Sequence, residues 1–538
     1  MHRNKSVSTH QFAMIPKADI PRSRFNMQKA LKTTFDSGLL VPILCEEILP
    51  GDSVRLKATL FGRLATPLVP VMDNLYLDTQ FFFIPNRLVW ENWQRFMGEQ
   101  DAPTDSTSYS VPSMVSQAGG YPPLSLFDYF GLPVAGQVGA AGTVPHSVLP
   151  LRGYNLVWNQ WYRDQNIQDS VTVNKDDGPD PQGDYGILRR GKRKDYFSGA
   201  LPFVQKGPAV TIPLGISAPV VPTGTGLPTF RNAPAGGGIS LGQMISQTAG
   251  ADMKSLSNTS GSNADMYWGV TALSVDLTGA TASTVNQLRQ SIQLQRLLER
   301  DARGGTRYRE ILKAHFSVDG GDPRLQRPEY LGGGTSMIAV SPVAQTSATD
   351  ISGSATPQAN LAAIGTVLAH GHGFTQSFVE HGYILGLASV RADLTYQQGL
   401  RRHWSRQSKV DFYWPVFSHL GEQAILRKEI YCVGDPNLDD LVFGYQERHA
   451  EYRYNPSEIT GLFRSSYSAP LDYWHLAQNF TTPPTLSPAF IEEHPPLQRI
   501  MAVGDEAAGQ EIILDVFYDI TMTRPMPLYA VPGMMDHF

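Results

Sequence analysis

The stretch Val54-Arg-Leu-Lys-Ala-Thr-Leu60 shows most directly which kind of fold this chain adopts. Its apolar residues at positions 54, 56, 58 and 60 alternate with Arg55, Lys57 and Thr59. A two-residue period is typical of a β-strand with one buried face, because successive side chains of a strand point to opposite faces. The stretch therefore predicts a half-buried strand whose other face is basic.

Three further segments predict strands that lie far from the first one in sequence. Residues 75–83 alternate and end before Pro85, residues 382–394 form a nearly continuous apolar run, and residues 512–522 alternate again near the C-terminus. Long excursions join these segments, and strands and helices do not alternate regularly. We therefore expect an antiparallel sandwich or jelly roll with inserted helices and loops.

Helical periodicity is confined to three places. Asn86 is expected to cap a short helix with Val89, Trp93, Phe96 and Met97 at its apolar positions. Residues 150–164 have helical spacing of Leu151, Tyr154, Trp158 and Trp161, and predict a helix docked on the core. The clearest helix is predicted from about Ser283 to Arg303, with Gly304-Gly305 as its stop.

The composition indicates a chain rich in turns and depleted in charge. Of 538 residues, 17% are charged, against about 25% in average globular proteins, while 49 are glycine and 39 are proline. Low charge suggests that much of the surface is buried against other chains, since interface cores are depleted in charge. The formal net charge of -5 means that any contact with nucleic acid must be local.

The sequence also bears on the compartment in which the chain folds. Two cysteines, Cys45 and Cys432, cannot build a disulfide framework and are consistent with a reducing cytoplasm. The first residues lack the apolar core of a secretion signal, and no apolar run approaches the roughly 20 residues that span a bilayer. We expect a soluble protein made in the cytosol.

Two segments differ from the rest of the chain. Residues 1–50 begin with many cations and little periodicity, which predicts a basic N-terminal arm that either binds phosphates or is a solvated tail. Residues 215–280 are rich in Gly, Ser, Thr, Ala and Pro but keep scattered apolar residues. Such a long insertion predicts a projecting subdomain within the larger 51–538 domain.

Possible metal sites have simpler alternatives. His370 and His372, with Glu380-His381, could supply metal ligands, but their spacing is not that of a helical metalloprotease pair. Asp176, Asp177, Asp180 and Asp184 could chelate calcium, yet they lack a calcium-loop pattern and favour a solvated loop. No phosphate-binding loop or serine-nucleophile elbow is present. We expect no catalytic residue, no metal and no cofactor.

A basic run beside aromatic residues is more suggestive. Arg401, Arg402, His403, Trp404, Arg406 and Lys409 precede Phe412-Tyr-Trp414. Arginines and aromatic rings together can bind single-stranded bases and phosphates. The same residue types are enriched at subunit interfaces. Both interpretations remain open, and the interface is slightly favoured.

Five sequence blocks resemble one known family. Phe443-Gly-Tyr-Gln-Glu-Arg-His-Ala-Glu-Tyr-Arg-Tyr-Asn-Pro-Ser457 closely resembles the GYQERWAEYRY-type signature of gokushovirus (Microviridae) major capsid proteins, with His449 where Trp is expected. The other blocks, in order along nearly the whole chain, are Phe35-Asp-Ser-Gly-Leu-Leu-Val-Pro42, Asp78-Thr-Gln-Phe-Phe-Phe-Ile-Pro-Asn-Arg87, Leu471-Asp-Tyr-Trp-His-Leu-Ala477 and Asp515-Val-Phe-Tyr-Asp-Ile-Thr-Met-Thr-Arg-Pro-Met-Pro527.

The resemblance implies an eight-stranded jelly roll of the viral capsid type. Such subunits form a T=1 icosahedral shell around a circular single-stranded DNA genome, and a long insertion projects at the threefold axes. Implied partners are other copies of the chain at five-, three- and twofold contacts, the genome, a small basic DNA-binding protein, a DNA pilot protein, an internal scaffolding protein and a host cell-surface receptor. The implied location is the virion, assembled in the host bacterial cytoplasm.

Two sets of residues are the site candidates under this interpretation. Candidates for DNA contact are Arg3, Lys5, Arg22, Arg24, Lys29, Lys32, Arg401, Arg402, Arg406 and Lys409. Candidates for the family signature or a subunit interface are Tyr445, Gln446, Glu447, Arg448, Glu451, Tyr452, Arg453 and Tyr454. Alternative functions are a jelly-roll enzyme that binds metal through the histidines and a phage adhesin with residues 215–280 at its tip.

Overall fold

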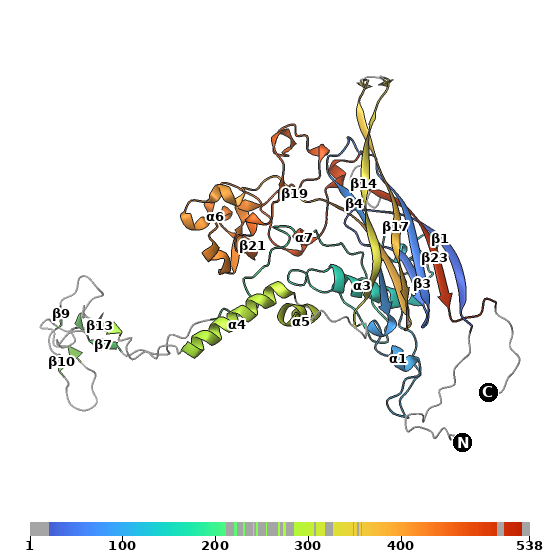
Figure 1. Cartoon of the computed structure of the whole chain (residues 1–538), viewed down its shortest axis with the longest axis horizontal. Helices are drawn as coiled ribbons and strands as arrows, with labels where there is room; N and C mark the ends of the chain where they lie inside the picture. Colours follow the sequence, from blue (N-terminus) through green and yellow to red (C-terminus); the bar gives the residue numbers. More distant parts are fainter. Residues whose placement is uncertain are drawn as a thin grey trace, which may run out of the picture. The chain divides into compact units, whose positions relative to one another are not determined.

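The structure, a computed structural model, describes most of the chain. The described residues are 21–210, 285–305, 308–317, 326–347, 349–351, 354–356, 358–502 and 511–529, with short strand segments between 220 and 275. The chain divides into two compact units, one of Met1–Val204 with Gly305–Phe538 and one of Gln205–Gly304. The first unit contains the sheet described next and is shown with the rest of the chain in Figure 1.

Eight antiparallel strands form the main sheet of the first unit, in the order β1-β23-β3-β17-β14-β4-β18-β2. β14 pairs with β17 near its end and with β4 over its first part, so it joins two four-stranded halves. Numbered along the chain, one half holds strands one, eight, three and six, and the other holds five, four, seven and two. This crossing pattern is that of a jelly roll, as predicted. The strands are β1 (Ser23–Phe35), β2 (Val41–Ile48), β3 (Ser53–Leu64), β4 (Leu75–Pro85), β14 (Glu329–Ala344), β17 (Leu361–Ser377), β18 (Gly382–Ala392) and β23 (Ile512–Arg524).

Sequence periodicity explains which strands are half-buried. In β3, Val54, Leu56 and Leu60 are at most 2% exposed, whereas Arg55 and Lys57 are exposed. β23 alternates in the same way, which confirms the strand predicted at 512–522. Both strands pack their apolar residues into the core between the two halves.

β4 and β18 are buried on both faces. Leu77 and Phe81 of β4 face the core between the halves, but Phe82 and Ile84 belong to a second apolar cluster. Leu385 and Leu387 of β18 join this second cluster, which helix α3 (Leu149–Val157) and the segment around Phe127 complete. One half of the sheet is therefore covered on its outer face, which explains the continuous apolar run at 382–394.

The predicted helices are present with somewhat different bounds. α3 continues as a π-helical turn at Trp158–Tyr162, so the helix predicted at 150–164 is confirmed. The helix predicted after Asn86 is instead a 3-10 turn at Asn86–Leu88 followed by α1 (Trp93–Phe96). The remaining described helices of the first unit are α2 (Leu126–Tyr129), α5 (Tyr308–Phe316), α6 (Pro436–Asp439) and α7 (Pro488–Ile491).

The second unit contains the clearest helix predicted from sequence, α4 (Val285–Gly304), which Gly305 follows with a φ of 89°. Most of residues 215–280 lie outside the described residues. The described strands of this unit are β7 (Val220–Pro222), β8 (Phe230–Arg231), β9 (Ser240–Leu241), β10 (Met244–Ile245), β11 (Lys254–Ser255), β12 (Tyr267–Trp268) and β13 (Leu273–Val275).

The first unit also contains short two-stranded sheets outside its main sheet. A third apolar cluster, which includes Tyr196, Phe197, Ile425 and Phe443, anchors the region around β20 and β21. The pairs are β5 (Ser113–Val115) with β6 (Pro145–Ser147), β15 (Thr349–Ile351) with β16 (Ser354–Thr356), β19 (Thr395–Tyr396) with β22 (Ser457–Glu458), and β20 (Glu422–Leu426) with β21 (Val442–Glu447).

Part of the predicted N-terminal arm belongs to the sheet. Residues 1–20 lie outside the described residues, but β1 pairs with β23 from Ser23 onward and β2 pairs with β18. The two end strands approach each other, since Lys29 Nζ lies 2.9 Å from Glu46 Oε1 and the Tyr518 hydroxyl donates to the Ile43 carbonyl at 3.0 Å. The sheet is therefore nearly closed.

No helix among the described residues has the length and apolar character needed to cross a bilayer.

Candidate assembly surface and nucleic-acid contacts

The signature block forms a hairpin and its following turn. β21 pairs with β20, and Tyr445 exchanges two backbone hydrogen bonds of 2.8 Å with Leu201. The Gln446 side chain donates to the Tyr196 carbonyl at 3.1 Å, and Glu447 forms an ion pair with Arg453. These contacts hold the block against the third apolar cluster, so a large part of the signature fixes this region internally.

The basic run at 401–409 lies beside the signature block and is bound to carboxylates. Arg402 Nη1 lies 2.9 Å from Glu429 Oε1, and Arg406 Nη2 lies 3.1 Å from Glu451 Oε1. Arg401 Nε lies 2.8 Å from Glu458 Oε2. These three arginines, predicted as DNA contacts, are therefore neutralised within the chain.

The ion pair between Arg402 and Glu429 stabilises the fold, because Glu429 is buried. Glu429 is 2% exposed at its side chain and also accepts from the Tyr196 hydroxyl at 2.8 Å. Burial raises the pKa of Glu429 despite the nearby Arg402 guanidinium. Loss of Arg402 would leave a buried carboxylate without its cation, which is a costly arrangement.

A pocket of about 240 Å³ lies between the basic run and the signature block. Its lining includes Arg401, Arg402 and Arg406 from the run and Glu451, Tyr452 and Tyr454 from the block. The Arg406 guanidinium also lies 4.6 Å from the Tyr452 ring centroid. The structure thus brings together the two sets of residues that the sequence singled out.

An exposed apolar cluster borders this pocket, and we name it the 404–420 cluster. It is built on three 3-10 turns, at Arg402–Ser405, Lys409–Asp411 and Pro415–His419. Backbone N–H groups of Ser408 and Gln407 donate to Asp411, which lowers the pKa of this carboxyl to about 2. The cluster consists of Trp404, Val410, Phe412, Tyr413, Trp414, Val416 and Leu420, which are 43% to 82% exposed.

Exposure of so many large apolar side chains on neighbouring turns is typical of a contact surface for another molecule. Lys409, for which the described part of the chain offers no carboxylate partner, lies 4.9 Å over the Trp414 ring. The local charge is therefore nearly balanced while apolar groups are exposed. This combination favours a protein interface over a nucleic-acid platform.

His449 replaces the expected tryptophan within this site. It is 5% exposed, adopts a left-handed backbone conformation with φ of 61°, and packs edge-on against the Tyr413 ring at 5.2 Å. Burial and the neighbouring Arg448 lower the pKa of His449. A neutral aromatic ring thus remains at this position, although it is smaller than the indole of tryptophan.

The N-terminal candidates for DNA contact differ in their partners. Arg22 donates to the Gly51 carbonyl at 2.5 Å, Lys29 pairs with Glu46, and Lys32 Nζ lies 3.2 Å from Asp515 Oδ2. Arg24 is exposed and has no hydrogen-bond or ion-pair partner among the described residues. Arg3 and Lys5 lie outside the described residues.

The histidines proposed as metal ligands do not converge. His372 is 4% exposed, its Nδ1 lies 2.7 Å from Thr79 Oγ1, and its Nε2 lies 3.0 Å from Ser336 Oγ. His381 packs against Trp93 at 5.5 Å, and Glu380 pairs with Arg87. Within the described part of the chain, no group of three or more potential ligands could hold a metal ion.

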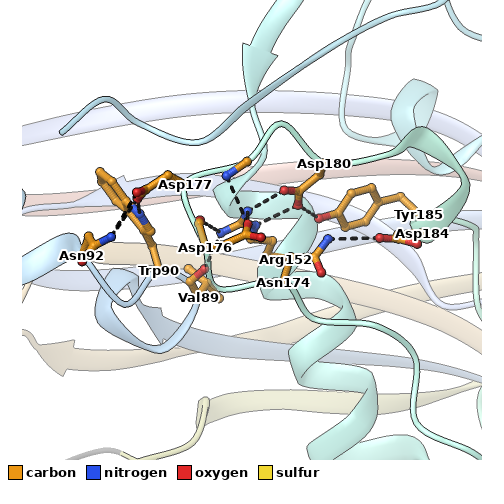
Figure 2. Close-up of polar contacts among 11 residues, drawn as sticks. Val89, Trp90, Asn92, Arg152, Asn174, Asp176, Asp177, Asp180, Asp184 and Tyr185 are labelled. Carbon is orange, nitrogen blue, oxygen red and sulfur yellow. Dashed lines mark hydrogen bonds and ion pairs between the residues drawn. The ribbon is translucent and has the colours of Figure 1, made fainter.

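The acidic loop at 176–184 surrounds a buried arginine (Figure 2). The Arg152 guanidinium donates to Asp180 through Nε at 2.8 Å and to the Asp176 carbonyl through Nη1 at 2.9 Å. Asp177 accepts from the Trp90 indole at 2.7 Å, and Asp184 accepts from Asn174 at 3.0 Å. The loop was expected to be solvated, and Asp176 and Asp177 are indeed exposed, but Asp180 is buried. Its carboxylates also attach the loop to α3 and to the turn at Trp90.

Sequence reasoning missed one set of cations. Arg55, Lys57 and Arg63 are exposed on β3 and, among the described residues, have no hydrogen-bond or ion-pair partner. The alternation of residues 54–60 had already identified this face as basic, but the cations were not considered for DNA contact.

Comparisons with known proteins agree over the whole chain. Residues 13–534 match the family described as Capsid protein (F protein). Capsid protein VP1 of Bdellovibrio phage phiMH2K is 48% identical over 535 residues, and the match covers 98% of each chain. Capsid protein VP1 of Chlamydia phage 1 is 42% identical over 596 residues, and that of Spiroplasma virus 4 is 34% identical over 551 residues, each again with 98% of both chains covered.

Proposed function

This chain belongs to the Capsid protein (F protein) family, and we propose that its copies close into a T=1 icosahedral shell around a circular single-stranded DNA genome. The family resemblance predicted from the signature block is confirmed. The protein is a structural major capsid protein, not an enzyme, and it self-associates as a component of the virion.

The observation that carries the proposal is the exposed 404–420 cluster on a jelly-roll unit. A closed shell needs heterologous contacts that repeat until rotation closes the assembly. Val416 is 82% exposed and Trp404 is 73% exposed, which is unfavourable unless another surface covers them. Since the capsid consists of copies of this chain, a second copy is the partner that we assign to the cluster.

The exposed signature residues support the same assignment. Tyr452 and Tyr454 are 54% and 44% exposed and lie along the pocket beside the cluster. The other residues of the block make internal contacts, namely Gln446, Glu447, Arg448, Glu451 and Arg453. Aromatic side chains of this kind frequently dominate the energy of protein interfaces.

The remaining partners follow from the proposed virion. Residues 215–280, within the separate unit Gln205–Gly304, would form the surface projection that contacts a host receptor. The net charge of -5 is too negative for the shell alone to neutralise a genome. This charge fits the presence of a small basic DNA-binding protein, which the family resemblance implies together with a DNA pilot protein and an internal scaffolding protein, during assembly in the host bacterial cytoplasm.

Sedimentation of the chain co-expressed with its scaffolding protein tests the proposal, with negative-stain microscopy of the fastest fraction. Uniform round particles are expected. An extended trimer would instead support an adhesin, and a slow species with tightly bound metal would support a metal-binding enzyme.

A further inference from the structure

The two halves of the jelly roll differ in what covers them. The outer face of β14-β4-β18-β2 is covered by the second apolar cluster, which α3 completes. The side chains that point outward from β1, β23, β3 and β17 are largely exposed among the described residues. We name this second surface the outer sheet face, and Figure 1 shows its four strands side by side.

The outer sheet face is cationic although the chain is acidic. Across the four strands, outward positions carry five cations and two carboxylates, while the whole chain has a net charge of -5. Of these cations, Lys32 alone forms an ion pair with another described residue, Asp515. The other outward charges are Arg24, Arg55, Lys57, Arg63 and Asp519.

Pairing register divides the outer sheet face into two parts. Toward one end, Phe61 lies beside Leu368, and both are more than half exposed. Toward the other end, Arg55 lies between Thr521 of β23 and Thr375 of β17. The cations Arg24, Arg55 and Lys57 all lie in this second, polar part, where no large apolar side chain is exposed.

The polar part contains a shallow groove of about 440 Å³. Its lining consists of Arg55 and Val54 with hydroxyl and amide groups of Ser53, Thr375, Gln376, Ser377, Thr521 and Thr523. Ser53 and Ser377 hydroxyls lie 2.8 Å apart, which fixes them across neighbouring strands. Arginine, lysine, serine, threonine and glutamine are the side chains that contact the phosphates and sugars of nucleic acids.

We propose that the polar part of the outer sheet face binds the phosphodiester backbone of the single-stranded genome through Arg24, Arg55 and Lys57. Arg55 and Lys57 are separated by about 7 Å along one strand, and Arg24 lies two strands away, at about 10 Å across the sheet. Among the described residues Arg24, Arg55 and Lys57 form no ion pair, although Asp519 lies opposite Lys57 in the β23–β3 register, so each cation can replace a counterion on a phosphate. Arg401, Arg402 and Arg406 cannot do so without breaking their ion pairs.

The chemistry of the surface favours DNA over an acidic peptide. A peptide ligand would need apolar pockets for its side chains, but this part of the face offers hydroxyls, amides, three cations and the single carboxylate of Asp519. It also lacks aromatic rings for base stacking, so the contact would be to the backbone and independent of sequence. The site rests on the proposed function, because it assumes that the shell encloses single-stranded DNA.

The test measures binding of a 20-nucleotide oligothymidylate to the full-length chain at several salt concentrations. The variant is Arg24→Gln, Arg55→Gln and Lys57→Gln together. The matched control removes the same charge from exposed positions of α4 through Arg289→Gln, Arg296→Gln and Arg300→Gln. Loss of three phosphate contacts is expected to make the slope of log K against log salt shallower by about 2, whereas the control keeps the parent slope.

Two further measurements make the result decisive. A variant with Arg24→Lys and Arg55→Lys should keep the parent slope, since charge and not guanidinium geometry is required. An unchanged slope in the triple glutamine variant would overturn the site. The triple glutamine variant could also keep its binding of the oligothymidylate while losing the binding of a polyglutamate peptide. That result would overturn the DNA site in favour of an acidic protein partner. Particle formation is scored separately, so failure of the shell and failure of this site remain distinguishable.

Discussion

Arg152 and Asp180 form a fully buried ion pair, with side chains 0% and 1% exposed, that ties the loop at 176–184 to helix α3. Burial alone would raise the pKa of Asp180, but hydrogen bonds from Arg152 and Tyr185 lower it below its usual value. The pair supports the second apolar cluster, which covers one half of the jelly roll. It therefore helps to hold in place the cover on the outer face of that half.

Asp180→Asn is expected to cost about 3 kcal/mol, because it leaves the buried Arg152 cation with the solvent-exposed Asp176 carboxylate as its remaining charged partner. Asp176→Asn should cost less than about 1 kcal/mol, since that carboxylate is 76% exposed. Urea unfolding of the unassembled chain, followed by tryptophan fluorescence, measures both. Equal losses for the two variants would contradict the structural role of Asp180.

Acid should weaken the same pair. The folded-state pKa of Asp180 is lowered, so its stabilising contribution is present above the unfolded value of about 4 and is lost as pH falls through the folded value. The difference in unfolding free energy between the parent chain and Asp180→Asn should therefore shrink below about pH 4. A difference that stays constant down to pH 2 would refute this linkage.

Arg402→Gln should reduce stability by about 3 kcal/mol or more and leave the oligothymidylate salt slope unchanged, because Arg402 is engaged with buried Glu429. Burial already raises the pKa of Glu429, so the defect should be smaller at pH 5 than at pH 8, where the carboxylate is charged.

The double variant Arg402→Gln with Glu429→Gln provides the control for this explanation. Its neutral amide can still accept from the Tyr196 hydroxyl, and much of the stability should return. A reduced salt slope in Arg402→Gln, with normal stability, would instead restore the interpretation of this run as a DNA contact.

His372→Ala should lower the melting temperature, whereas His370→Ala should not. The His372 ring contacts Thr79 and Ser336 and lies against Gly334, where an added Cβ would come within 2.4 Å of the ring. His370 is exposed. A chelator should leave the melting temperature of the parent chain unchanged, and a marked fall on chelation would revive the metal-binding alternative.

Val416→Glu should leave the unassembled chain as stable as the parent and sharply reduce the yield of particles, since Val416 is 82% exposed in the 404–420 cluster. The matched control is Val379→Glu, at a site that is 79% exposed in the turn between β17 and β18. Sedimentation measures the particle yield. Normal assembly of the Val416 variant would remove the cluster from the subunit interface.

Local periodicity was sufficient to predict the strands that alternate between core and solvent. β3 and β23 follow directly from apolar residues at every second position. β1 was interpreted as part of an arm because Lys29 interrupts its apolar series and its partner strand lies nearly 500 residues away. Pairing over such a distance leaves no local signal in the sequence.

The site residues were likewise predictable only where the signal lies in neighbouring residues, and not where it depends on a partner elsewhere in the chain. The composition of residues 401–414 predicted a DNA contact or a subunit interface, but the carboxylates Glu429 and Glu451 that neutralise its arginines lie 27 and 45 residues further along the chain. Likewise, no spacing links Arg152 to Asp180. The free cations of β3 could have been recognised from alternation alone, because that pattern already placed them on the exposed face.

The most direct test of the central claim is a three-dimensional reconstruction, by electron cryomicroscopy, of particles formed by this chain. We expect a closed T=1 icosahedral shell of jelly-roll subunits in which the 404–420 cluster of each copy is covered by a neighbour. A fibre, an open trimer, or a closed shell that leaves this cluster exposed to solvent would contradict the account.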